Sequence, residues 1–227
     1  MAKRESLKKE SESKLTLETK GHAKPSWISN KAFDIIKLVL GICLLPFVYS
    51  STVAFLGQLT FIEPLLQNSF WSGVITFLLV YLFVLEPVWV YERGHKLLEF
   101  IFSFFQPFVK VAPYLLPVYV ITVFIIYLIL AVFIKEAWLA HYTMFILGFS
   151  IVLHLVFSSK AVRSKKGDIL KSNYVFGFAF IYIINLGALA FFLNVMFKDF
   201  SFVSFCNNAY FISGGIFKEI YSQFFVV

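Results

Sequence analysis

The stretch WSGVITFLLVYLFVLEPVW, residues Trp71–Trp89, decides the class of this protein because it is long, apolar and carries a single charged side chain, Glu86. A run of about 20 apolar residues is long enough to cross the hydrocarbon core of a bilayer as an α-helix. Backbone groups in lipid must find hydrogen-bond partners within their own segment, so a helix is the required form. The stretch therefore predicts an integral membrane protein.

The composition of the whole chain supports the same class. Of its 227 residues, 59% are hydrophobic and only 15% are charged, whereas about a quarter of the residues in a soluble domain are charged. Further apolar runs predict an all-α bundle of about five transmembrane helices, which together form one domain over residues 32–197. We expect the spans at residues 35–56, 70–90, 114–134, 138–157 and 174–197.

Two segments lie outside the expected bundle. Residues 1–31 are polar and rich in charge, without the apolar region of a signal peptide, so we expect a solvated and flexible tail. Residues 198–227 contain apolar pieces that are short for a span, and a glycine pair, Gly214 and Gly215, that should interrupt a helix. We expect this segment to lie at the membrane interface or to fold back against the bundle, with a re-entrant segment as the alternative.

Lysine and arginine are unevenly distributed between the two ends of the expected spans. The N-terminal tail and the loops after the second and fourth spans are rich in them, whereas the other loops are poor. The positive-inside rule then places the N-terminus in the cytoplasm and the C-terminus outside. The net charge of +7 thus indicates orientation rather than nucleic-acid binding. We expect the partners to be the lipid bilayer and other membrane proteins, with no nucleic acid.

A polar stretch, VYERGHKLLEF at Val90–Phe100, follows the second span at its cytoplasmic end. On a helix, Glu92, His95 or Lys96, and Glu99 are three or four residues apart and share one face. One interpretation is an amphipathic surface helix with an exposed Glu92–Lys96 pair. The other interpretation starts from the zinc motif His-Glu-x-x-His, in which two His hold the ion and the Glu acts as general base.

The residues YERGH have the spacing of the zinc motif, with Glu92 at the position of the base and His95 at that of the second ligand. Tyr91 stands where the first His is expected. A Pro-Tyr-x-x-Pro-x-Tyr segment, an apolar span that contains His154, an acidic residue and a span that contains Asn185 follow in that order. We expect Asn185 to form a hydrogen bond with a neighbouring helix.

Over residues 70–192, this order of segments resembles the site-2 protease family of intramembrane zinc metallopeptidases, especially its short bacterial members. The resemblance implies that the motif helix lies at the cytoplasmic side of the membrane and that a later Asp supplies the third zinc ligand. By position, that residue is Asp168. His154 is then either a further ligand or a buried, hydrogen-bonded group.

Two residues of the motif disfavour an active zinc site. A neutral phenol with a pKa near 10 makes Tyr91 a poor ligand, and the permanently charged Arg93 repels a cation. We therefore expect a non-catalytic homologue without a resident cofactor, which serves as a scaffold or regulatory subunit in a bacterial cytoplasmic membrane. One alternative is an active zinc peptidase that uses Glu92 as base and His95 and Asp168 as ligands. The other is a small transporter or channel component.

Overall fold

The computed structural model describes residues 27–84, 88–101, 112–134, 136–164 and 174–225. Within these ranges every element is a helix and no strand occurs, so the predicted all-α membrane bundle is confirmed. The chain divides into two units, Met1–Lys37 and Leu38–Val227. The described part of the first unit is the start of α2 (Trp27–Leu59), which begins inside the predicted tail 1–31; the rest of that tail lies outside the described residues.

Four of the described helices are long and apolar enough to cross a membrane. They are α2, α3 (Pro64–Leu79) with its π-helical continuation η1 (Val80–Val84), α8 (Ala137–Ser164) and α9 (Tyr174–Met196). A fifth apolar helix, α7 (Val118–Phe133), has only 16 residues and reaches about 24 Å at 1.5 Å per residue. Each of the five predicted spans overlaps one of these helices.

The backbones of α3 and α8 touch where the two helices cross. A Cβ atom on Gly73 would lie 1.9 Å from the carbonyl oxygen of Phe145, and one on Gly148 would lie 2.2 Å from that of Phe70. Any side chain at either position would therefore collide with backbone atoms. The main hydrophobic core surrounds this crossing and combines side chains from six helices, among them Phe55, Phe70, Val120, Met144, Leu147, Leu189, Leu193 and Phe205.

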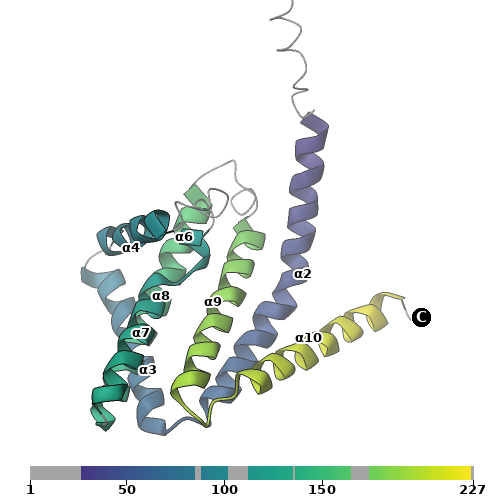
Figure 1. Ribbon diagram of the computed structural model, residues 1–227. Helices are drawn as coiled ribbons and strands as arrows, with labels where there is room; N and C mark the ends of the chain where they lie inside the picture. The colour runs from purple at the N-terminus through teal and green to yellow at the C-terminus, as the bar shows by residue number, and fades with distance from the viewer. Residues whose placement is uncertain (1–26, 85–87, 102–111, 135, 165–173, 226–227) are drawn as a thin grey trace, which may run out of the picture. The chain divides into compact units, whose positions relative to one another are not determined.

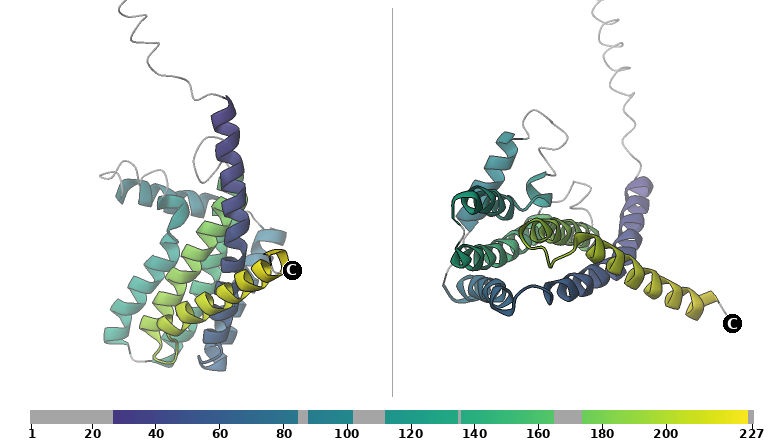
Figure 2. Two further views of the ribbon diagram at one scale, coloured as in Figure 1. Left: turned by 90° about the vertical axis from the view of Figure 1, so that its right-hand side faces the viewer. Right: turned by 60° about the horizontal axis from the view of Figure 1, so that its bottom comes forward.

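The polar stretch after the second predicted span forms a separate helix, α4 (Val88–Ile101). The predicted span to Val90 was therefore too long, because residues 88–90 belong to α4. Figures 1 and 2 show α4 running across one end of the bundle instead of continuing α3. Charged side chains on four positions of α4 favour water over hydrocarbon. The sequence also places Pro87 between the two helices, and proline cannot donate the hydrogen bond that a continuous helix needs.

A single helical turn, α6 (Ala112–Leu115), precedes α7 and packs beside α4, α8 and α9. Asn185 on α9 is fully buried and donates from Nδ2 to the carbonyl oxygen of Leu115 at 3.0 Å and to that of Ile181 at 2.8 Å. The predicted hydrogen bond between Asn185 and a neighbouring helix is therefore confirmed. It satisfies a carbonyl group at the end of α6, where no further helical turn follows to bind it.

The C-terminal segment forms one continuous helix, α10 (Phe202–Phe225). Gly214 and Gly215 lie within it, so the expectation that they interrupt a helix was wrong. A glycine costs a helix only about 1 kcal/mol relative to alanine, which is too little to interrupt a helix of 24 residues. The ring of Phe217, just beyond the glycine pair, lies 5.6 Å from the ring of Phe47 on α2. The position of α10 relative to the bilayer stays a prediction.

Candidate functional site

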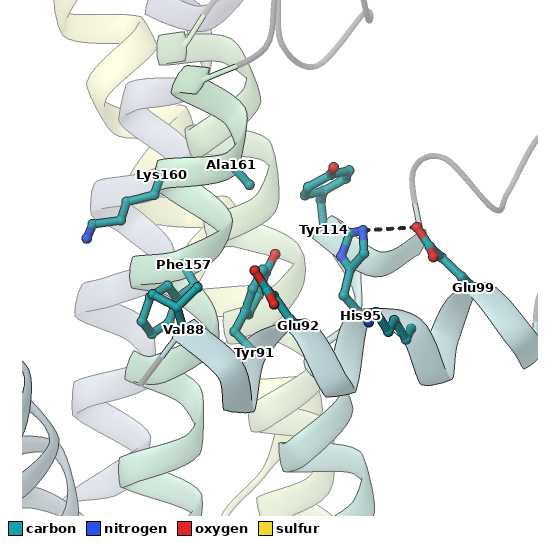
Figure 3. A pocket seen from close by; sticks show the side chains of 10 residues that line it. Val88, Tyr91, Glu92, His95, Glu99, Tyr114, Phe157, Lys160 and Ala161 are labelled. Atoms are coloured by element: carbon teal, nitrogen blue, oxygen red, sulfur yellow. Dashed lines mark ion pairs between the residues drawn. The ribbon is translucent and has the colours of Figure 1, made fainter. Parts of the chain in front are cut away.

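Three of the predicted site residues lie together on α4. Tyr91, Glu92 and His95 line a pocket of about 540 Å³ between α4, α6 and the end of α8 (Figure 3). Tyr91 and Glu92 precede His95 by four and three residues, which brings all three to one side of the helix. Asp168, the predicted third zinc ligand, lies outside the described residues, so its closeness to His95 stays a prediction.

The fourth predicted residue, His154 on α8, lies close to Tyr91, with ring centroids 6.2 Å apart. Only 3% of His154 is exposed. Its Nε2 atom lies 3.2 Å from the carbonyl oxygen of Tyr114 and 3.2 Å from Oγ of Ser158, and this Oγ lies 3.3 Å from the hydroxyl of Tyr91. Tyr91, Ser158, His154 and the Tyr114 carbonyl thus form a hydrogen-bonded group, here called the Tyr91 cluster, which joins α4, α6 and α8.

The Tyr91 cluster fixes a proton on His154. A carbonyl oxygen can only accept a hydrogen bond, so Nε2 must carry the hydrogen that it shares with the Tyr114 carbonyl. A protonated ring nitrogen has no lone pair to offer a metal ion. Of the two roles considered for His154, this geometry corresponds to the buried, hydrogen-bonded one.

His95 forms an ion pair one helical turn further along α4, with its Nε2 atom 3.3 Å from Oε1 of Glu99. One of the two interpretations of this helix paired Glu92 with Lys96, but neither of these side chains forms an ion pair with another described residue. The ring of His95 lies 5.0 Å from the ring of Tyr114 in an edge-on contact, which holds the imidazole in place beside Glu99 (Figure 3). The pairing on this face of α4 therefore leaves Glu92 and Lys96 facing the pocket.

The hydroxyl of Tyr91 is in its neutral form at physiological pH. Burial raises its pKa to about 12, and the hydrogen bond with Ser158 opposes this effect only in part. A tyrosine ligand would need to be a phenolate, which a bound cation can favour but a buried neutral environment does not. Tyr91 is therefore poorly suited to replace the imidazole at this position.

We expect the raised pKa of Tyr91 to appear in the pH dependence of stability. The unfolded phenol loses its proton near pH 10, and the folded one near pH 12, so its stabilising contribution is complete below pH 10 and is lost as the pH rises to 12. Thermal unfolding of the wild type and Tyr91→Phe should therefore give melting temperatures whose difference shrinks between pH 10 and pH 12. A constant difference over this range would contradict the burial of a neutral phenol.

The described residues do not fit a catalytic zinc centre. Such a centre takes three protein ligands and keeps one position for water. Within the described ranges, no three His, Cys, Asp or Glu side chains lie close enough together to hold a metal ion. The Nε2 atoms of His95 and His154 both face oxygen acceptors. We therefore assign no chemical step to a metal ion at this site.

Several residues that position α4 escaped the sequence analysis. The hydroxyl of Tyr119 donates to the carbonyl oxygen of Val90, and Gly94 allows the approach, since a Cβ atom there would lie 2.9 Å from the Tyr119 ring. Ser158 was also missed, although it follows His154 by four residues in an apolar span. Two polar residues at this spacing share a helix face, and that signal was available in the sequence.

Comparisons of the chain with protein-family models, curated proteins and solved structures find no match in any of the three. The fold defines the protein as a helical, apolar chain of the kind that forms integral membrane bundles. Its candidate site is a polar pocket at the end of two of the spans. The resemblance to site-2 proteases rests on the order of sequence segments and stays a hypothesis.

Proposed function

We propose that this protein is a non-catalytic relative of the site-2 proteases that acts by binding, as a scaffold or regulatory subunit of a membrane assembly. The observation that carries the proposal is the Tyr91 cluster. Its hydrogen bonds engage the Tyr91 hydroxyl and Nε2 of His154, which are polar atoms that a metallopeptidase would direct at a metal ion. The cluster holds helices together in place of an ion.

The location of the cluster explains how it would support binding. It joins the surface helix α4 to α6 and to the end of α8, where water is scarce and an unpaired polar group is costly. Satisfying these groups fixes α4 at the end of the spans and keeps Glu92 and Lys96 facing the adjacent pocket. A pocket lined by exposed charges of both signs is suited to binding a charged ligand or partner.

The proposal includes an orientation. The distribution of lysine and arginine favours a bacterial cytoplasmic membrane with the N-terminus inside and the C-terminus outside. The pocket of α4 then opens toward the cytoplasm, on the same side as the charged loops after the second and fourth predicted spans. Cytoplasmic proteins or lipids of the inner leaflet would be the molecules that reach it.

Metal analysis of the purified full-length protein tests the non-catalytic assignment. After incubation with Zn²⁺ and removal of excess ion, we expect far less than one zinc per chain, because the buried phenol of Tyr91 is a poor ligand and Nε2 of His154 is engaged with the Tyr114 carbonyl. The variants His95→Ala, Asp168→Ala and His141→Ala should give the same result as the wild type.

His141 is the matched control because it lies near the opposite end of α8, where its Nδ1 atom is 3.3 Å from Oγ of Ser69. One zinc per chain that is lost in His95→Ala and Asp168→Ala but retained in His141→Ala would overturn the proposal. That result would favour the active peptidase, with Glu92 as base.

A further inference from the structure

The pocket beside α4 lies at the ends of two apolar helices that are long enough to span a membrane. The span of α3 ends at Phe83 and that of α8 ends at Val162, and the last turns of α8 contribute Phe157, Lys160 and Ala161 to the pocket wall. α4 begins at Val88, directly after the α3 span. The polar headgroup region adjoins the hydrocarbon core at this level, so a lipid can reach the pocket without leaving the bilayer.

The face of α4 next to the pocket is built to contact lipid. Trp89, Leu97 and Phe100 are 60%, 48% and 79% exposed. The guanidinium of Arg93 lies 5.1 Å from the centre of the Trp89 ring, in a cation–π contact. Exposed aromatic and aliphatic side chains combined with a cation are typical of a helix that lies in the membrane interface.

The pocket is lined by charged side chains of both signs and by aromatic rings. Glu92 and Lys96 are one helical turn apart, both line the pocket, and neither forms an ion pair with another described residue. Rings of Tyr114 and Phe157 line it with them, as Figure 3 shows. A ligand that satisfies both charges must itself carry a cation and an anion about one helical turn, roughly 5 Å, apart.

We infer that this pocket binds the headgroup of a zwitterionic phospholipid with a primary ammonium, of the phosphatidylethanolamine class. Glu92 accepts hydrogen bonds from the ammonium, and Lys96 pairs with the phosphate, both of which are charge-assisted contacts. The acyl chains stay in the bilayer beside the spans. The inference rests on the proposed function, because a pocket committed to zinc and water would not accept this ligand.

The primary ammonium distinguishes this lipid from its competitors. The methylated nitrogen of phosphatidylcholine has no N–H to donate to Glu92. Phosphatidylglycerol has no cation at all, so its binding would leave the Glu92 carboxylate beside a phosphate. An unmet charge or hydrogen bond of this kind is a stronger basis for selectivity than a small difference in shape.

Native mass spectrometry of the full-length protein, with equal amounts of the three lipids added, tests the inference. We expect the wild type to retain phosphatidylethanolamine in preference to the other two. Glu92→Gln should lower this retention about tenfold, as the loss of one charged hydrogen bond implies. The same variant should strengthen phosphatidylglycerol binding, because no carboxylate then lies beside its phosphate. Lys96→Gln should weaken the binding of all three lipids, since each has a phosphate.

The controls Glu63→Gln and Lys218→Gln remove equivalent charges outside the pocket, and both should retain the wild-type preference. Free phosphoethanolamine should compete with the lipid, which separates recognition of the headgroup from general binding to the apolar surface. Equal retention of the three lipids by the wild type, or an unchanged preference in Glu92→Gln, would overturn the inference. Stoichiometric zinc would instead contradict the proposed function, so the two failures are distinguishable.

Discussion

Alanine in place of Gly73 is expected to destabilise the protein by about 3 kcal/mol, because overpacking at a tight contact commonly costs this much. The new Cβ atom would lie 1.9 Å from the carbonyl oxygen of Phe145 and 2.8 Å from its carbon. These are backbone atoms of α8, which cannot move aside as a flexible side chain can. Thermal unfolding in detergent, followed by circular dichroism, measures the effect as a lower melting temperature.

Gly187→Ala is the matched control for this variant. Gly187 lies in another membrane span, α9, and a Cβ atom there meets nothing within 4 Å. Because alanine favours the helix by about 1 kcal/mol over glycine, this control should be as stable as the wild type or slightly more stable. Equal melting temperatures for Gly73→Ala and Gly187→Ala would show that α3 and α8 do not touch as described.

Phe77→Ala is expected to have the second large effect, a loss of about 3 to 5 kcal/mol in the free energy of unfolding. Phe77 is fully buried, and its ring stacks on Tyr81 at 5.9 Å and meets Phe149 edge-on at 5.2 Å. From Tyr81 the contacts continue through Phe157 to the ring of Tyr91. The variant removes the first ring of this series of contacts, which ends at Tyr91 on α4. We therefore expect α4 to be bound less tightly to the bundle as well.

Unfolding by denaturant measures the change, and Phe83→Ala supplies the comparison. Phe83 lies in the same span but is 78% exposed, so its loss should leave the protein core unchanged. Faster proteolysis within α4 in Phe77→Ala, but not in Phe83→Ala, would show the effect on the surface helix. Similar stabilities of the two variants would contradict the central position of Phe77.

The sequence predicted the class of fold because membrane helices are determined by local properties. Length and apolarity alone indicate a span, and they placed α7 and α9, and the apolar parts of α2 and α8, to within about five residues. They could not show that Gly73 and Gly148 mark a backbone contact, since a small residue in an apolar helix does not reveal its partner. Nor did the glycine pair in α10 act as a break, because glycine disfavours a helix by only about 1 kcal/mol per residue.

Helical periodicity predicted which residues of the candidate site share a face of α4, but not which side chains pair with one another. The spacing of Tyr91, Glu92 and His95 places them on one side of a helix, and the expected topology brought His154 to the same end of the bundle. Pairing between side chains was harder to predict, because a contact with Tyr114 from another helix turns His95 toward Glu99. Such a choice depends on the tertiary environment, which sequence spacing does not contain.

The glycine crossing also limits how the molecule can move. Two helices whose main chains touch at Gly73 and Gly148 cannot slide or rotate past one another without losing van der Waals contact at these positions. α3 and α8 should consequently move together as one rigid body. Any opening or closing of the pocket must come from tilting of α4 relative to these two helices. The hydrogen bond from the Tyr119 hydroxyl to the Val90 carbonyl would be the pivot of that motion.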